Sequence, residues 1–136
     1  MTAAYVTGLL YFAAVFTFAF FTGVARVLFV APRLGPTTAV LLEVPILVLA
    51  SWLFARRLLR SRSLTLSQRG VMGATAFTLT MASEAALSAI MRGQSVIDWA
   101  AAVATPLGLV GLVGQVAFAA IPIFVGYGRT DISPMA

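Results

Sequence analysis

Hydrophobic residues run almost without interruption through four stretches of the chain. These stretches cover residues 3–31, 37–55, 70–91 and 99–127, and polar residues gather in the short segments between them. Each stretch is close to or above the ~20 residues with which an α-helix crosses about 30 Å of hydrocarbon. Backbone groups in lipid must be paired within the segment, which a helix achieves. The pattern therefore predicts an all-α polytopic membrane protein with one domain, residues 1–136, folded as a four-transmembrane-helix bundle.

The arginines predict how the bundle is oriented. The connector between the second and third stretches, residues 56–69, holds Arg56, Arg57, Arg60, Arg62 and Arg69. Connectors rich in Arg stay in the cytoplasm, and an even number of spans then places both termini there (N-in/C-in). We expect a multi-pass protein of a bacterial inner (cytoplasmic) membrane, in which these five arginines contact anionic lipids at the cytoplasmic face. Because the arginines lie beside the ends of the predicted spans, we expect no nucleic acid partner.

Composition excludes several classes of chemistry. Hydrophobic residues make up 61% of the 136 residues and charged residues only 10%, and the chain has no His, Cys or Lys. Soluble domains have about 25% charged residues. Without imidazole or thiolate ligands, the common haem, iron–sulfur, zinc and copper sites lack their usual donors. We therefore expect no cofactor, no metal and no enzymatic activity.

Three charged side chains lie inside the hydrophobic stretches: Arg26, Glu43 and Glu84. A charge near the centre of a bilayer is costly, so such residues usually face the bundle interior and find a partner. Arg26 lies nine residues before Gly35 and Glu43 eight residues after it. Residues equidistant from the turn of a helical hairpin lie at similar depth, here about 8 to 12 Å below the outer surface. The spacing predicts an ion pair between Arg26 and Glu43.

Glu84 is predicted to lie at the same level. It precedes Arg92, at the outer end of the third stretch, by eight residues, and Thr80 and Ser88 lie one turn to either side on the same helix face. One intramembrane polar cluster of five residues can therefore form: Arg26, Glu43, Glu84, Thr80 and Ser88. Gln115 is expected to lie deeper and to reach this cluster only through water or tilt.

The charge balance of this cluster leaves two interpretations open. One arginine and two glutamates carry a net charge of minus one when all are ionised, and a medium of low dielectric constant disfavours that excess. In one interpretation the cluster ties three helices together and fixes their register. In the other, Glu84 or Glu43 exchanges a proton that is coupled to transport.

Prolines and glycines mark turns and kinks. Pro32 and Gly35 are expected to end the first helix. Pro45 is either a first-turn residue of the second helix or the site of a kink, and Pro122 is the better kink candidate because it interrupts the fourth helix. Three glycines, spaced by three residues, give that helix a smooth face on which another helix can pack, in this chain or a second copy: Gly108, Gly111 and Gly114.

Part of the first hairpin resembles a known group of proteins. The pattern Gly23-x-x-Arg26-x-Leu28-x-x-x-Pro32-x-x-Gly35, followed by Glu43-x-Pro45, resembles small uncharacterised bacterial membrane proteins with four predicted spans. This resemblance implies the fold but no activity, because the group has none assigned. Small multidrug transporters have a similar size and number of spans. Their pattern, however, puts an essential Glu in the first helix, where this chain has Arg26.

These features are compatible with three functions. The leading hypothesis is an integral membrane protein that acts through helix contacts, as an accessory or assembly subunit of a membrane complex or as a homo-oligomer. The alternative is a small proton-coupled transporter or channel that uses Arg26, Glu43 and Glu84. A membrane enzyme with Glu43 and Glu84 as acid and base is the third, but the chain offers no nucleophile, metal site or phosphate-binding loop for it.

Overall fold

The computed structural model describes residues 1–125, and this part of the chain is helical with no strand, which confirms the all-α prediction. The elements are α1 (Thr2–Ala25), the π-helix η1 (Arg26–Val30), α2 (Ala31–Leu34), α3 (Pro36–Arg60), α4 (Leu66–Arg92), α5 (Val96–Val103) and α6 (Pro106–Phe124). The last two residues of the fourth predicted helix, 126–127, lie outside the described residues.

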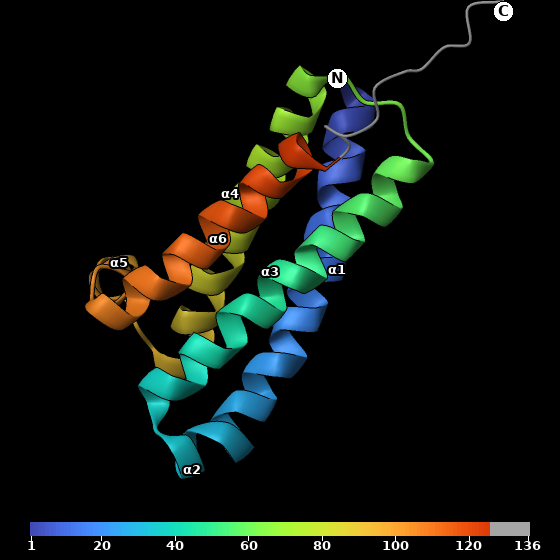
Figure 1. Ribbon diagram of the computed structural model, residues 1–136. Coiled ribbons are helices and arrows are strands. Elements are labelled where there is room, and N and C mark those ends of the chain that lie inside the picture. Colours follow the sequence, from blue (N-terminus) through green and yellow to red (C-terminus); the bar gives the residue numbers. More distant parts are fainter. Residues whose placement is uncertain (126–136) are drawn as a thin grey trace, which may run out of the picture.

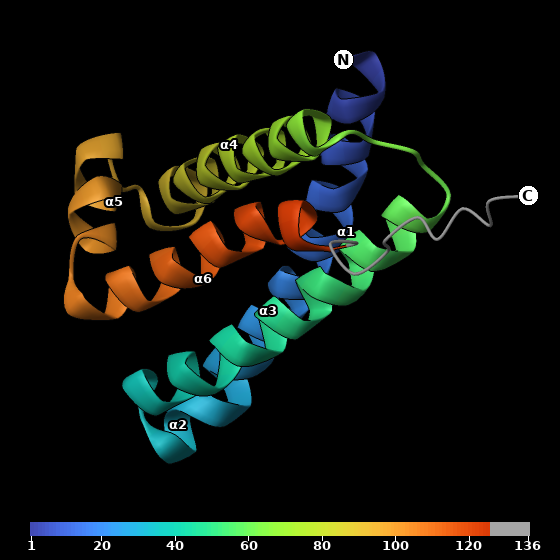
Figure 2. The same cartoon turned by 45° about the horizontal axis from the view of Figure 1, so that its top comes forward.

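Four helical segments are long and apolar enough to cross a membrane, as the sequence predicted. They are the continuous run Thr2–Leu34, then Pro36–Arg60, Leu66–Arg92 and Pro106–Phe124. They form a ring in which α1 packs against α3 and α4, and α6 packs against the same two helices. Met1 and the α3–α4 connector lie at one end, here called the terminal end, and α2 and α5 lie at the other, the turn end (Figure 1). Towards the turn end the α1–α3 hairpin and the α4–α6 hairpin diverge (Figure 2).

The connector at the terminal end is shorter than predicted. α3 continues to Arg60 and α4 begins at Leu66, so the connector covers residues 61–65 instead of 56–69. Thr65 starts α4 with a capping box, in which its hydroxyl accepts from the Gln68 N–H and its own N–H donates to the Gln68 side chain. The arginines lower the hydrophobicity before the helix ends. The helix continues through them because Arg and Leu favour helix whatever the polarity of their surroundings. Most of the connector arginines therefore lie on helix ends.

The fourth predicted helix, 99–127, is wrong as a single element because the chain turns a corner at Ala104–Thr105. Thr105 caps α6 by accepting from the Gly108 N–H, and Pro106 occupies the first turn, where it needs no N–H partner. Gly108 makes the corner possible, because a Cβ there would lie 2.3 Å from the Ala102 carbonyl oxygen. The apolar pattern runs through the corner and gives no sign of it.

The turn between the first two long helices is tight. Gly35 has φ 84° and ψ 157°, a conformation that suits glycine, and α3 starts at the next residue, Pro36. The helix ends at Leu34, so the predicted stop at Gly35 is confirmed, whereas Pro32 lies inside α2. Before it the backbone widens into η1, where the Ala31 N–H donates to the Arg26 carbonyl five residues back. Sequence periodicity did not predict this widening.

The core of the bundle depends on small residues that let helices approach closely. A Cβ on Gly73 of α4 would lie 1.9 Å from the Ala119 carbonyl oxygen of α6, and a Cβ on Gly8 of α1 would lie 2.8 Å from the Met72 carbonyl of α4. Helix backbones that approach closely gain dispersion contacts. These contacts hold helices together even in lipid, where the hydrophobic effect does not drive helix association. Around these contacts lie the buried side chains Tyr11, Val15, Met72, Ala76, Phe118 and Ile121.

The three glycines of α6 do not share one partner helix. Gly108 faces the corner with α5, Gly114 faces Val44 of α3, and Gly111 has open space around it. The glycine at position 73, which the sequence did not single out, makes the closer helix contact.

Candidate functional site: two polar contacts between helices

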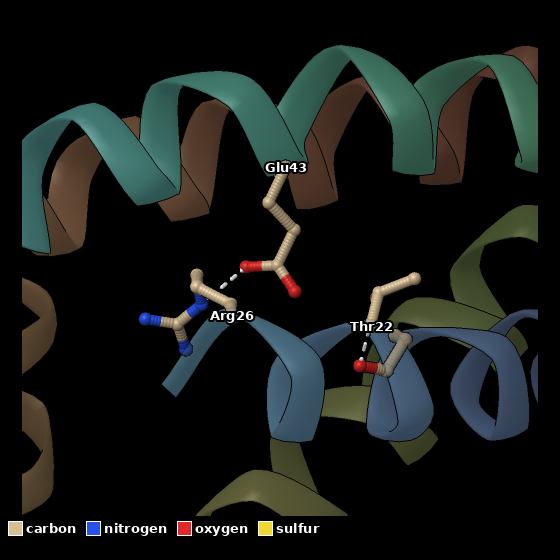
Figure 3. A network of polar contacts seen from close by, with 4 residues as sticks. Thr22, Arg26 and Glu43 are labelled. Carbon is tan, nitrogen blue, oxygen red and sulfur yellow. Dashed lines mark hydrogen bonds and ion pairs between the residues drawn. The ribbon is translucent and has the colours of Figure 1, made fainter. Parts of the chain in front are cut away.

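Arg26 and Glu43 form the ion pair predicted from their spacing. The Arg26 Nε lies 2.6 Å from the Glu43 Oε2, and the side chains are 30% and 13% exposed. In Figure 3 the Glu43 carboxylate points from α3 toward α1, with Arg26 on one side and Thr22 on the other. The contact therefore joins the first residue of η1, directly after α1, to the second turn of α3.

Two residues of α1 lie near this carboxylate without a hydrogen bond to it. A Cβ on Gly23, one turn before Arg26, would lie 3.8 Å from the Glu43 Oε1, which is an ordinary van der Waals contact, so the carboxylate does not require glycine there. The Thr22 hydroxyl donates to the Ala19 carbonyl at 3.1 Å and so is used within its own helix. Arg26 meets the carboxylate through its Nε edge. The Nε is buried and close to Glu43 but makes no hydrogen bond, and neither do the two terminal nitrogens within residues 1–125.

The second contact joins the other hairpin. The Gln115 Nε2 of α6 donates to the Glu84 Oε1 of α4 at 2.5 Å. The prediction that Gln115 lies deeper was wrong, because it counted depth from residue 99, before the corner that starts α6. Counted from Pro106, Gln115 is nine residues into its helix, and Glu84 is eight residues before Arg92. The two side chains therefore lie at one level.

The single cluster predicted from the sequence divides into these two contacts. Within residues 1–125, Glu84 has no arginine nitrogen within 4 Å, the distance that defines an ion pair. The Thr80 hydroxyl donates to the Ala76 carbonyl of its own helix at 2.9 Å, and the Ser88 hydroxyl donates to the Gln94 Oε1 at the corner after α4. Because α4 packs between α1 and α6, and the hairpins diverge at the turn end (Figure 2), Glu84 meets α6 instead of Arg26.

The two prolines inside long helices differ in their surroundings. Pro45 is the tenth residue of α3 and is exposed, so the first-turn interpretation was wrong. Pro122 is buried in α6 and has no N–H for the carbonyl of Phe118, four residues earlier. The hydroxyl of Tyr11 donates to that carbonyl at 2.9 Å, and the Tyr11 and Phe118 rings stack with centroids 4.7 Å apart. A proline at position 122 implies that the Phe118 carbonyl lacks its helical partner. The sequence pattern does not indicate that the Tyr11 hydroxyl donates to this carbonyl.

The five connector arginines fall into two groups. Arg62 donates to the Thr7 hydroxyl at 3.4 Å, and Arg69 donates to the carbonyls of Leu64 and Val125, so these two tie the connector to the bundle. The other three are exposed along the last turns of α3: Arg56, Arg57 and Arg60.

Two shallow apolar grooves lie on the surface of the described part of the chain. One, of about 290 Å³, runs between α1 and α3 and is lined by Phe18, Ile46, Leu49, Ala50, Leu53 and Phe54. The other, of about 360 Å³, runs between α4 and α6 and is lined by Gly70, Ala74, Phe77, Val116, Ala119 and Ala120. Neither is lined by the two glutamates of the polar contacts. Residues 1–125 contain no group of three or more Asp or Glu side chains placed to hold a metal ion.

Comparison with known proteins gives no match to a protein family, a curated protein or a solved structure. The resemblance of residues 23–45 to uncharacterised four-span proteins therefore stays an expectation.

Proposed function

We propose that this chain is a multi-pass integral membrane protein that acts through helix contacts and not by catalysis, as an accessory or assembly subunit of a membrane complex or as a homo-oligomer. The observation that carries the proposal is that both intramembrane carboxylates are used to join neighbouring helices, Glu43 to Arg26 and Glu84 to Gln115. Buried polar pairs of this kind hold helices in register. Many large apolar side chains of the long helices stay exposed and available to lipid or to another helix.

Purification of the tagged chain from its own membrane in mild detergent tests this proposal. Mass photometry and mass spectrometry should find a particle larger than one copy, which contains either further copies or a second membrane protein. A particle of one copy with no companion, found also after crosslinking in the intact membrane, would contradict the proposal.

We propose the N-in/C-in orientation in a bacterial inner membrane. The three exposed arginines at the end of α3 support it, because they gather at the terminal end beside the connector and favour the cytoplasm and its anionic lipids. Alkaline phosphatase inserted after Gln94 should be active, since that site faces the periplasm, and the same enzyme inserted after Ser63 should be inactive. The reverse pattern would show the opposite orientation.

A specific observation favours proton-coupled transport as a second candidate. Glu84 is partly buried and its partner is an uncharged amide, so no cation within residues 1–125 holds its carboxylate ionised. A carboxyl in this situation can gain and lose a proton. In liposomes with a pH gradient, Glu84→Gln should abolish proton flux measured with an enclosed pH dye. Asp98→Asn, which removes an exposed carboxylate of α5, should leave the flux unchanged. Equal flux in the wild type and Glu84→Gln would remove this residue from any transport mechanism.

A further inference from the structure

The ion pair leaves part of the Arg26 guanidinium unused. The Glu43 Oε2 lies 2.6 Å from the Nε as an ion pair, but none of the guanidinium nitrogens makes a hydrogen bond within residues 1–125, although the side chain is 30% exposed. In Figure 3 the two terminal nitrogens lie on the side away from Thr22, in the direction in which α1 continues to the turn end. A guanidinium presents its donors as a planar fork that matches carboxylate or phosphate oxygens. This edge of Arg26 is therefore a free anion-binding group.

The apolar groove between α1 and α3 starts about one turn from Glu43, on the side of the ion pair that faces the terminal end. Its residue Phe18 lies eight residues before Arg26, and Ile46 and Ala50 lie three and seven residues after Glu43, so that they share a face of their helices with the ion pair. From Ile46 to Phe54 the groove follows α3 for about 12 Å. One anionic group and one long apolar segment can thus be held together along the same hairpin.

Arg26 lies toward the turn end of the first long helical run. The rod Thr2–Leu34 has 33 residues and is about 50 Å long, which is longer than the ~30 Å of hydrocarbon that it would cross. Arg26 lies eight residues, or about 12 Å, before the end of that rod. Its terminal nitrogens extend toward the turn end, which shortens their distance to the head groups of that leaflet.

The local charge favours an anion. Between residues 1 and 43 the side chains of Arg26, Arg33 and Glu43 leave one positive charge. Arg33 lies at the turn end, where it donates to the Phe29 carbonyl at 2.7 Å. A single negative charge on an incoming head group would balance this excess, whereas a zwitterionic head group would not.

We infer that Arg26 and the α1–α3 groove form a binding site for one anionic phospholipid of the outer leaflet. Its phosphate accepts from the terminal nitrogens of Arg26, and one acyl chain lies between Phe18 and Leu53. The site rests on the membrane insertion proposed above, which the phosphatase fusions test separately, and it does not depend on the subunit role.

Native mass spectrometry of the full chain in detergent tests the site, with phosphatidylglycerol and phosphatidylcholine of identical acyl chains as probes. The wild type should retain phosphatidylglycerol in preference. Phosphatidylglycerol with a photoreactive acyl chain should label peptides of α1 and α3 that line the groove. In the double variant Arg26→Gln/Glu43→Gln, two amides replace the charges, and phosphatidylglycerol binding should fall about tenfold to the level of phosphatidylcholine.

A second variant and a matched control keep the test decisive. Ala50→Leu fills the groove without removing a charge, and it should reduce groove labelling by both lipids. This variant tests the site even if the double variant fails to fold. The triple variant Arg56→Gln/Arg57→Gln/Arg60→Gln removes exposed charge at the terminal end, and its groove labelling should be unchanged.

Two results would overturn the inference. One is labelling of the groove that neither Ala50→Leu nor the double variant reduces. The other is a dimer in which the groove is not labelled and which the variant Ala50→Leu dissociates. That result would show that a second copy covers this face.

Discussion

The hydroxyl of Tyr11 compensates for a hydrogen bond that Pro122 removes from α6. The carbonyl of Phe118 has lost its partner within the helix, and the Tyr11 hydroxyl, from a different helix, takes its place. In an apolar environment an unpaired carbonyl is costly. One side chain therefore both allows the proline and attaches α1 to α6.

Removal of the hydroxyl should destabilise the bundle most while the proline is present. Tyr11→Phe should cost about 1 kcal/mol, measured by thermal or denaturant unfolding in detergent. In a Pro122→Ala background the backbone regains an N–H that can reach the Phe118 carbonyl, so the same change should cost clearly less. An equal cost in both backgrounds would show that the two residues do not act together.

Gly73 is the position at which a single methyl group should do most damage. A Cβ there would lie 1.9 Å from the Ala119 carbonyl oxygen, and a backbone atom cannot rotate away. Gly73→Ala should therefore push α4 and α6 apart and lower stability by about 1–3 kcal/mol. Gly70→Ala is the matched control one turn earlier in α4, where a Cβ meets nothing within 4 Å. A melting temperature equally affected by both changes would contradict the packing described.

At the scale of the elements, the hairpin of α1 and α3 depends on the ion pair to set its register. Either Arg26→Gln or Glu43→Gln alone leaves one charge without its partner and should cost about 1.5–3 kcal/mol. The double variant should cost less than the sum of the two by about 1 kcal/mol or more. Simple additivity in unfolding experiments would mean that the pair contributes no coupling. Arg33→Gln, at the exposed end of the same hairpin, serves as a control and should change stability little.

The start of α5 should respond to acid. Hydrogen bonds from the Ser95 hydroxyl and N–H hold the pKa of Asp98 below its usual value. The folded form therefore binds its proton less readily than the unfolded form. The resulting stabilisation is present above the ordinary pKa of Asp and is lost as the pH falls through the lowered pKa.

Trp99 fluorescence, in a Trp52→Phe background, should report fraying of α5 below that pH. In Ser95→Ala the stronger of the two hydrogen bonds is missing, so the transition should move to higher pH. An unshifted transition would show that another group controls it.

The sequence predicted the elements well where hydrophobicity decides them and less well where local geometry does. The four spans and the level of Arg26 with Glu43 follow from length and from the distance to a glycine turn. The corner at Ala104–Thr105 does not, because it combines a cap, a proline and the close approach of Gly108 inside an apolar run. That missed corner also caused the wrong depth for Gln115. The partner of Glu84 depends on which helices are neighbours, and periodicity within one helix contains no such information.

At the scale of the whole molecule, the ring order places α3 against α6, and this contact can be tested directly. A Cβ at position 114 would lie 3.8 Å from the Val44 Cβ, within the range of about 3.5–4.5 Å found in disulfides. The chain contains no cysteine, so Val44→Cys/Gly114→Cys should form an intramolecular disulfide on mild oxidation, detected as a mobility shift that a reductant reverses. Val44→Cys/Gly111→Cys should not. Equal crosslinking of both pairs would mean that the ring is loosely packed.

The contact between Tyr11 and Phe118 has a consequence for how the chain is assembled during synthesis. A ribosome completes the Arg26–Glu43 pair within one hairpin, but it makes Phe118 long after Tyr11, at a separation of 107 positions. The first hairpin can therefore neutralise its charges early. The Tyr11 hydroxyl can form its hydrogen bond only after the last long helix has been made. Chains that stop before this helix keep a Tyr11 hydroxyl without an acceptor, and the surfaces of α3 and α4 that α6 would cover stay exposed. These features distinguish an unfinished product from a finished one.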